Sequence, residues 1–200
     1  MSHSAADRHS PDFPSLAGLG TLDEARQGFE AAGVAEPERV STFLDQLYGQ
    51  VGEDERRDLT SEPRRVEMLA TLGGGSPFLA DVLLRTPRYA RDLVEGIEAG
   101  PEAQSRLAEI RTPETVAGDF HAAIQLEREP QQRMNALRRV HRRHVLRIGA
   151  CDLLGLWDLP NVTAQLSHLA DAAIQAGLEI AAGWSGDDPA GFAVLGMGKL

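Results

Sequence analysis

Apolar residues recur every three or four positions along most of this chain, which is the spacing of an amphipathic helix. Between residues 40 and 51 they fall at i, i+3, i+4, i+7, i+8 and i+11, where they are Val40, Phe43, Leu44, Leu47, Tyr48 and Val51. We expect this face to be buried. No strand signal precedes residue 192, so the pattern predicts a mainly α fold, with a helical bundle over residues 19–190.

Local signals mark where several of these helices begin. Thr21-Leu22-Asp23-Glu24 has the form of a capping box, in which two side chains each bind a backbone N–H at a helix start. Ser76-Pro77, Thr86-Pro87 and Thr112-Pro113 each place an N-cap residue before a proline at the first helical position. We predict helices of about ten residues from 76 and from 87, and a longer helix from 113. Gly73-Gly74-Gly75 is expected to interrupt the helical pattern.

The second half of the chain predicts two long helices. Residues 131–158 form the first, and the second follows Leu159-Pro160 with one continuous apolar stripe made of Val162, Leu166, Leu169, Ala173, Ala176 and Ile180. Ser167, Asp171 and Gln175 lie off this stripe. The short connection at 158–160 predicts an antiparallel hairpin. We interpret Trp157 and Trp184 as packing residues, and residues 183–190, GWSGDDPA, as a turn-rich linker.

The first of these long helices carries an unusual number of basic residues. Six arginines lie between Glu129 and Asp152 without any acidic residue among them; they are Arg133, Arg138, Arg139, Arg142, Arg143 and Arg147. A solvated helix face that pairs with acids on neighbouring helices is the ordinary interpretation. The alternatives are an electropositive surface for an acidic partner or for nucleotide phosphates, and a surface for nucleic acid.

The amino-acid composition limits the classes of protein to which this chain can belong. The chain has 200 residues, of which 42% are hydrophobic and 25% charged, and a formal net charge of −10, which is typical of a soluble globular protein and argues against a general nucleic-acid binder. Cys151 is the only cysteine, so no intramolecular disulfide or cysteine-based zinc site can form. Residues 1–18 read as a poorly ordered tail, and no stretch has the length of a signal peptide or a membrane span. We therefore expect a cytoplasmic protein without membrane contact.

His141 and His144 lie three residues apart on one helix, a spacing that can chelate a metal ion. No Cys, Asp or Glu falls within one turn to complete a ligand set. Ordinary packing or surface histidines are therefore favoured, and no metal ligand is assigned in this chain.

The last ten residues, GFAVLGMGKL, differ from everything before them. The apolar run 192–195 between glycines predicts a short buried strand, whose partner strands must come from elsewhere. The P-loop template fails, because Ala193 and Leu200 stand where it requires a glycine and a hydroxyl residue. The dinucleotide-binding fingerprint matches only at Gly196 and Gly198, and the start of a dinucleotide-binding domain remains an alternative.

A third template covers more of the chain. FAVLGMGKL resembles the start of the first nucleotidyltransferase domain in the bifunctional glutamine synthetase adenylyltransferase/adenylyl-removing enzymes. Residues 147–178, RIGACDLLGLWDLPNVTAQLSHLADAAIQAGL, and residues 76–87, SPFLADVLLRTP, resemble two helical segments that precede it in that family. The chain departs from the family's usual pattern at Cys151, where an arginine is common, and at Trp157, where a small residue is common.

This resemblance carries several expectations for the fold and the site. It implies a helical bundle leading into the first strand of a truncated polymerase-beta-like nucleotidyltransferase domain, with the boundaries 1–18, 19–190 and 191–200. Gly196, Gly198 and Lys199 would bind the nucleotide's phosphates, because glycine admits the close approach of backbone and lysine adds positive charge. The family's catalytic carboxylates would follow this turn in a Glu-Leu-Asn and an Asp-x-Asp motif, so no catalytic residue is assigned here. Asp187 and Asp188 precede the strand and are interpreted as turn residues.

The resemblance also implies an activity and its partners. Enzymes of this family attach AMP from ATP to a tyrosine of glutamine synthetase and remove it with phosphate to give ADP, in regulating nitrogen assimilation. Removal belongs to the N-terminal half, in which this chain would lie. Mg²⁺ as cofactor and glutamine synthetase, a PII signalling protein, ATP, ADP and phosphate as partners follow from the same resemblance. The chain alone is expected to be inactive. The hypothesis from another class is a helical interaction module whose arginine-rich helix docks an acidic partner.

Overall fold

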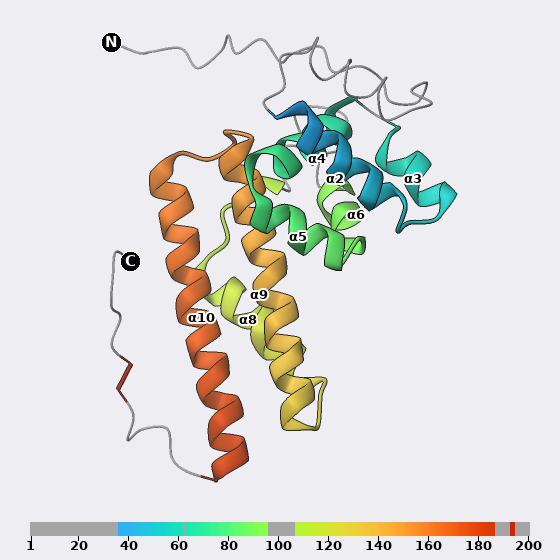
Figure 1. Cartoon of the computed structure of the whole chain (residues 1–200). Coiled ribbons are helices and arrows are strands. Elements are labelled where there is room, and N and C mark those ends of the chain that lie inside the picture. Colours follow the sequence, from blue (N-terminus) through green and yellow to red (C-terminus); the bar gives the residue numbers. More distant parts are fainter. Residues whose placement is uncertain (1–35, 62, 96–106, 187–192, 195–200) are drawn as a thin grey trace, which may run out of the picture. The chain divides into compact units, whose positions relative to one another are not determined.

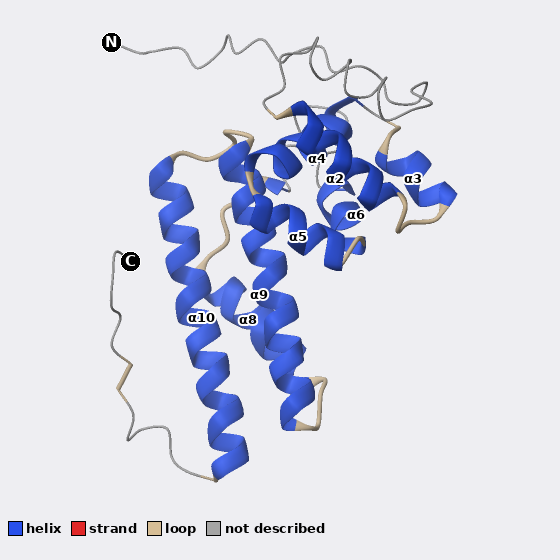
Figure 2. Ribbon diagram, viewed as in Figure 1, coloured by secondary structure: helices blue, strands red, loops and turns tan. Residues whose placement is uncertain are grey.

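The structure, a computed structural model, describes residues 36–61, 63–95, 107–186 and 193–194 (Figure 1). Every regular element in these ranges is an α-helix (Figure 2), so the prediction of a mainly α fold is confirmed. The chain divides into two compact units, Met1–Glu98 and Ala99–Leu200. In the described part of the chain, no helix is long and apolar enough to cross a membrane.

The first unit is built from five described helices around an apolar core. They are α2 (Pro37–Tyr48), α3 (Glu53–Leu59), α4 (Pro63–Gly75), α5 (Pro77–Arg85) and α6 (Arg88–Glu95). The predicted apolar face of α2 is buried at Val40, Phe43, Leu44 and Leu47, each at most 3% exposed. Tyr48 is only partly buried, and Val51 lies beyond the end of α2, which is capped by Gly49.

The expectation that Gly73-Gly74-Gly75 would interrupt a helix is wrong, because α4 runs through all three glycines. The reason is packing. A Cβ on Gly73 would lie 2.2 Å from Cδ1 of Phe43, so α4 can pass close to α2 only where it lacks a side chain. Arg39 on α2 also donates to the carbonyl of Gly74, with Nη2 and O 2.5 Å apart. Close helix packing has overridden a weak local propensity.

The predicted helix starts within the described residues are confirmed. The Ser76 hydroxyl accepts a hydrogen bond from the N–H of Leu79 at 3.3 Å and begins α5. The Thr112 hydroxyl accepts one from the N–H of Thr115 at 3.3 Å and begins α8 (Pro113–Gln125). Helix α6 begins at Arg88, one residue after the predicted start at Pro87, and Thr86 is the C-cap of α5. The capping box at 21–24 and the tail at 1–18 lie outside the described residues.

Within its described residues, the second unit contains three packed helices, α8, α9 (Pro130–Leu153) and α10 (Leu159–Ser185). Helices α9 and α10 lie side by side and run in opposite directions, and α8 packs against both (Figure 1). The predicted hairpin is therefore confirmed. Asp158 caps α10, because its carboxylate accepts a hydrogen bond from the N–H of Asn161 at 3.0 Å.

The predicted stripe on α10 is only partly correct. Val162, Leu169, Ala176 and Ile180 are buried as expected. However, Leu166 is 44% exposed and Ala173 is only partly buried, whereas Gln165 and Ala172 are buried at 2% and 3% exposure. The buried face is therefore rotated from the predicted one, because α8 and α9 pack against α10 from one side of the wheel. Ser167, Asp171 and Gln175 are exposed, as predicted.

Two further expectations at the end of α10 are corrected. The helix continues through Gly183, Trp184 and Ser185, where a linker was expected, and ends at Gly186, whose φ of 76° is the left-handed conformation that glycine adopts without strain. Trp184 is 75% exposed rather than packed, because the helical period places it off the face that packs on α8 and α9.

The strand expected at 192–195 is not confirmed. Ala193 and Val194 have irregular, exposed backbone, and no strand occurs within the ranges that the structure describes. A single strand has no ladder of its own to form, and the expectation that its partner strands lie elsewhere stays a prediction. Phe192 and Leu195 lie outside the described residues, as do Asp187 and Asp188.

Candidate functional site

The segment 107–111, which leads into α8, is held by side chains rather than by secondary structure. Its backbone carbonyls accept hydrogen bonds from four side chains, which we call the carbonyl clamp: Cys151 to Leu107, Trp157 to Ala108, Arg147 to Glu109, and Gln165 to Arg111. Three of the donors precede α10 in the chain and one lies on it. Irregular backbone next to a core needs such partners, because an unpaired buried carbonyl is unfavourable.

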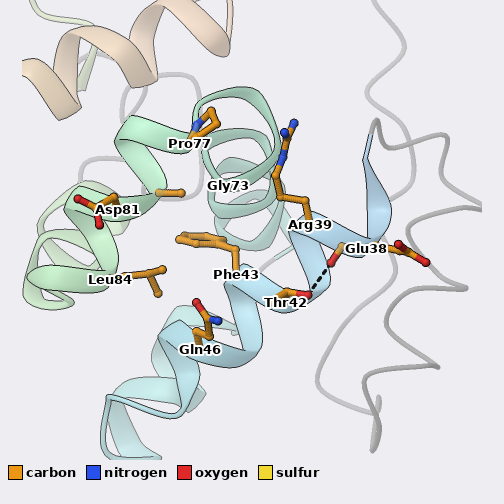
Figure 3. A pocket seen from close by; sticks show the side chains of 10 residues that line it. Glu38, Arg39, Thr42, Phe43, Gln46, Gly73, Pro77, Asp81 and Leu84 are labelled. Atoms are coloured by element: carbon orange, nitrogen blue, oxygen red, sulfur yellow. Dashed lines mark hydrogen bonds between the residues drawn. The ribbon is translucent and has the colours of Figure 1, made fainter.

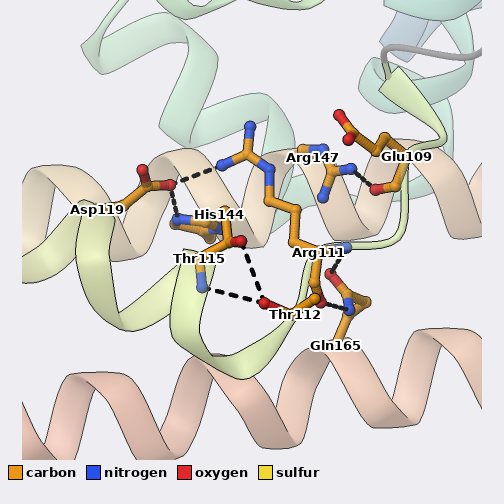
Figure 4. A network of polar contacts seen from close by, with 8 residues as sticks. All are labelled: Glu109, Arg111, Thr112, Thr115, Asp119, His144, Arg147 and Gln165. Atoms are coloured by element: carbon orange, nitrogen blue, oxygen red, sulfur yellow. Dashed lines mark hydrogen bonds and ion pairs between the residues drawn. The ribbon is translucent and has the colours of Figure 1, made fainter.

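Gln165 forms hydrogen bonds with both backbone polar groups of one residue, Arg111. Its Nε2 donates to the carbonyl of Arg111 at 2.7 Å, and its Oε1 accepts from the N–H of the same residue at 3.4 Å (Figure 4). His168 lies beside it, with Nδ1 3.3 Å from both Gln165 Nε2 and the Arg111 carbonyl oxygen. This amide fixes the residue directly before the Thr112 cap, and therefore the point at which α8 begins.

Arg147 is buried at 8% exposure, which is unusual for a guanidinium. It donates to the carbonyl of Glu109 and lies over the ring of Trp157, 5.0 Å from the ring centroid. Its Nε and Nη1 are buried and have no hydrogen-bond partner in the described structure. Burial, and then the charge of Arg111, lowers the pKa of Arg147 from its ordinary value.

A charged cluster lies next to the clamp (Figure 4). Asp119 on α8 accepts from Arg111 Nη1 at 2.6 Å and lies 3.0 Å from Nε2 of His144 on α9. His144 is 6% exposed and stacks on Phe120, with ring centroids 6.0 Å apart. Burial, followed by the charge of Arg111, lowers the pKa of His144 to about 4, and Asp119 opposes this shift. His144 is therefore neutral near pH 7 and donates through Nε2.

Neither His144 nor Cys151 is arranged for chemistry. Burial raises the pKa of the Cys151 thiol to about 12, so the reactive thiolate is scarce at neutral pH. Nε2 of His144 already binds the carboxylate of Asp119. Its neighbour His141 belongs to no metal-ligand set, since no group of three or more potential metal ligands occurs among the described residues. The clamp and the charged cluster thus position elements of the second unit.

The arginines of α9 lie in two environments: some bind groups of this chain, and others are exposed to solvent. Arg147 is buried, and Arg133 donates to the carbonyl of Glu127 at 3.0 Å. Arg139 forms an ion pair with Glu127 at 3.0 Å, which agrees with the ordinary interpretation of a charge run. Arg142 and Arg143 are exposed and form no ion pair within the described ranges.

The first unit contains a cavity of about 390 Å³ between α2, α4 and α5 (Figure 3). Phe43 and Leu84 point into it, and Gly73 forms part of its wall. Arg39, Glu38 and Asp81 lie at its polar edge. Apolar atoms make up most of this lining, so the cavity is suited to receive an apolar group.

Gly196, Gly198 and Lys199, the residues predicted to bind a nucleotide, lie outside the described residues. Their role stays a prediction. The sequence interpretation missed the polar residues that organise the second unit, namely Arg111, Asp119 and Gln165. For Gln165 a signal was available, because it lies between Val162 and Leu169 on the inward side of α10. For Asp119 and Arg111 the sequence contains no such signal, because only the tertiary structure brings these two residues together.

The described part of the chain thus defines a helical protein whose buried polar groups hold segments in place. The chain belongs to the glutamate-ammonia ligase adenylyltransferase family, whose model matches residues 66–200. It is similar to bifunctional glutamine synthetase adenylyltransferase/adenylyl-removing enzymes from several bacteria. The protein from Nocardia farcinica is 31% identical over 84% of this chain and 16% of its own length.

The proteins from Mycobacterium tuberculosis and Mycobacterium leprae give the same result. They are 34% and 32% identical, each over 71% of this chain and 14% of their own length. The chain therefore spans about one sixth of the length of the curated relatives that it matches. No solved structure matches the chain significantly.

Replacing Gln165 by leucine should destabilise the second unit. The leucine would leave the N–H of Arg111 without a partner and its carbonyl with only His168 within reach, at a cost of about 1–3 kcal/mol in the free energy of unfolding. Gln175→Leu, an exposed position on the same helix, should change it by less than about 0.5 kcal/mol. Urea denaturation followed by circular dichroism measures both variants. Equal effects would show that Gln165 does not anchor the segment.

The stability of the second unit should depend on pH through His144. Because its pKa is lowered to about 4 in the folded state, from an ordinary 6.5, its contribution is complete above pH 6.5 and is lost as the pH falls toward 4. Lowering the pH from 7 to 5 should therefore reduce the free energy of unfolding by about 2 kcal/mol through His144. His144→Gln should remove this difference. Denaturation at both pH values measures it, and an unchanged pH dependence in the variant would contradict the assignment.

Proposed function

We propose that this chain is the N-terminal, adenylyl-removing part of an enzyme that adenylylates and deadenylylates glutamine synthetase, and so regulates nitrogen assimilation. The observation that carries the proposal is the family match over residues 66–200, which includes the final GFAVLGMGKL segment. The names of the relatives support the same activity and the same protein substrate.

In this proposal, residues 191–200 begin the nucleotidyltransferase domain. The hydrogen phosphate ion that acts as nucleophile forms a bond to the phosphorus of the AMP group, and the bond from that phosphorus to the tyrosine oxygen breaks. The proton of the hydrogen phosphate passes to the tyrosine oxygen, which gives ADP and the free tyrosine hydroxyl. Gly196 and Gly198 let the backbone approach the nucleotide's phosphates, and Lys199 adds positive charge beside them. Phosphoryl and nucleotidyl transfer depend mainly on such positioning and neutralisation of charge.

The Mg²⁺ that this chemistry uses would be held by carboxylates. The described residues gather no set of three or more potential ligands, so they do not fit the ion and we derive no step through it for them. ATP, ADP, phosphate and a PII signalling protein enter the proposal through the family resemblance alone. The structural contribution of the described residues is the second unit, in which the carbonyl clamp and the packing of α8 and α9 fix α10.

Measuring the adenylyl-removing activity of the chain provides a direct test of this proposal. The 200-residue chain, incubated with adenylylated glutamine synthetase, Mg²⁺ and phosphate, should release no ADP. A chimera that joins Leu200 to the following part of the Nocardia farcinica relative should release it. Lys199→Ala in the chimera should lower the rate on the order of tenfold to a hundredfold, because positive charge near the phosphates is lost.

The matched control is Asp187→Asn in the same chimera, which should retain the rate because we assign that carboxylate to a turn. Release of ADP by the 200-residue chain alone would refute its inactivity. A chimera that folds, but whose rate is insensitive to Lys199→Ala, would refute the proposed phosphate-binding role. A folded chimera without any activity would count against the proposed function itself.

A second candidate function is docking of an acidic partner on α9. Arg142 and Arg143 are exposed and lack an ion pair in the described part of the chain, so their charge is available to a partner. Arg139 is partly neutralised by Glu127, so the available basic surface is narrower than the run of six arginines predicts. Glutamine synthetase is the acidic partner to test first, since it is the substrate in the proposed function.

Reversing Arg142 and Arg143 to glutamate should weaken binding of the chain to glutamine synthetase on the order of tenfold at low salt, and less at high salt. Arg85→Glu with Arg91→Glu makes the same change in net charge on exposed positions of the first unit and should leave the affinity closer to that of the wild type. Surface plasmon resonance at two salt concentrations measures this. Equal losses in both double variants would indicate a nonspecific charge effect and would exclude the α9 surface.

A further inference from the structure

The cavity of the first unit is a groove between two helices, which we call the α2–α5 groove. Five of its ten lining residues lie on α2 and four on α5, and Gly73 of α4 lies between them. Phe43 and Leu84 point into the groove (Figure 3). Its rim is exposed at six positions: Glu38, Arg39, Thr42, Gln46, Pro77 and Asp81. A mostly apolar groove that opens to solvent between two packed helices is suited to receive an apolar side chain from a third helix.

The position of the groove along the chain indicates its occupant. Residues 1–35 lie outside the described residues, belong to the same unit and end at Glu36, and the lining of the groove begins two residues later, at Glu38. A segment tethered this close to a groove is present there at an effective concentration on the order of millimolar. Tethering therefore favours the N-terminal segment of this chain as the occupant over a second copy or another protein.

The sequence of this segment contains an apolar face. Counted at 100° per residue from the capping box at 21–24, four apolar residues fall within an arc of about 80°: Leu22, Ala25, Phe29 and Ala32. No acidic residue between positions 21 and 35 falls within this arc, and Phe29 is the only aromatic residue of the stretch. The arc extends about 15 Å along a helix, which is comparable to the distance of about 12 Å along α2 from Glu38 to Gln46.

The connection to α2 fixes the direction of such a helix. Only residues 33–36 separate Ala32 from Pro37, the first residue of α2. Glu36 has a left-handed φ of 57°, so the chain turns at this residue and does not continue the axis of α2. A connection of about two to five residues between helices places them side by side and antiparallel. In that arrangement Phe29 lies beside the second turn of α2, where Thr42 lines the groove.

We propose that residues 22–32 pack against α2 as an antiparallel hairpin and place the side chain of Phe29 in the α2–α5 groove. The phenyl ring then meets Phe43 and Leu84, the two apolar side chains that point into the groove. The groove is thus an internal contact of the first unit, which its own N-terminal segment closes, and not a site for a separate ligand.

Disulfide cross-linking within one chain tests the arrangement. In the 200-residue chain, Phe29→Cys combined with Thr42→Cys should form an intramolecular disulfide on the order of tenfold faster than Phe29→Cys combined with Asp45→Cys. Asp45 is the matched control, because it is exposed on α2 and does not line the groove. The native Cys151 is buried and gives little background. Equal rates would overturn the proposal, and disulfide-linked dimers would do so by assigning the groove to a second copy.

Hydrogen exchange measured by mass spectrometry tests the energetic contribution of Phe29. Phe29→Asp should make the amides of α2 and α5 exchange on the order of tenfold faster, because a carboxylate is unfavourable in an apolar groove. Gln27→Asp is the matched control, since it adds the same charge to the segment outside the apolar arc, and it should leave these amides unchanged. The amides of α8 to α10 serve as an internal reference.

Equal exchange in the Phe29→Asp and Gln27→Asp variants would contradict a buried phenyl ring. Faster exchange in Phe29→Asp without the preferred Thr42 cross-link would place Phe29 elsewhere in the unit, and would overturn the proposal as well. Both measurements are independent of the proposed enzymatic function, because they require neither nucleotide nor glutamine synthetase.

Discussion

The second unit depends on hydrogen bonds from side chains to the backbone of residues 107–111. This segment has no helix or sheet to satisfy its carbonyls, so the carbonyl clamp does so from three different parts of the chain. The clamp ties the start of α8 to α9 and α10 at one point. A helix that must begin at a defined place relative to its neighbours needs such an anchor, since apolar packing alone tolerates sliding along the helix axis.

Most of the described helices can be placed from the sequence. Ser76, Thr112 and the prolines that follow them act within one turn, so their effect can be predicted without tertiary structure. The three glycines at 73–75 cannot be interpreted in this way. At Gly73 a side chain would collide with Phe43, thirty residues earlier, so only a glycine lets α4 pass α2 this closely, and only the fold brings the two residues together.

Helix α10 shows a second limit of sequence patterns. Helical spacing alone predicts one buried stripe, but the apolar residues belong to two faces, of which one packs on α8 and α9 and the other is exposed. Leu166 and Ala173 satisfy the spacing of either face. A buried glutamine identifies the inner one, because Gln165 is the only residue of that face able to bind backbone. For the candidate site, the residues GFAVLGMGKL are enough to indicate the family, whereas the role of their glycines stays a prediction.

The division of the chain into two compact units has a thermodynamic consequence. Two units with separate cores can unfold in separate transitions, so a single melting temperature is not a well-defined property of this chain. The buried, neutral imidazole of His144 makes the stability of one of these units, the unit of α8, α9 and α10, depend on pH. Acidification toward pH 4 would lower the free energy of unfolding of the unit of α8, α9 and α10 through this group, because the unfolded chain binds a proton there that the folded unit excludes.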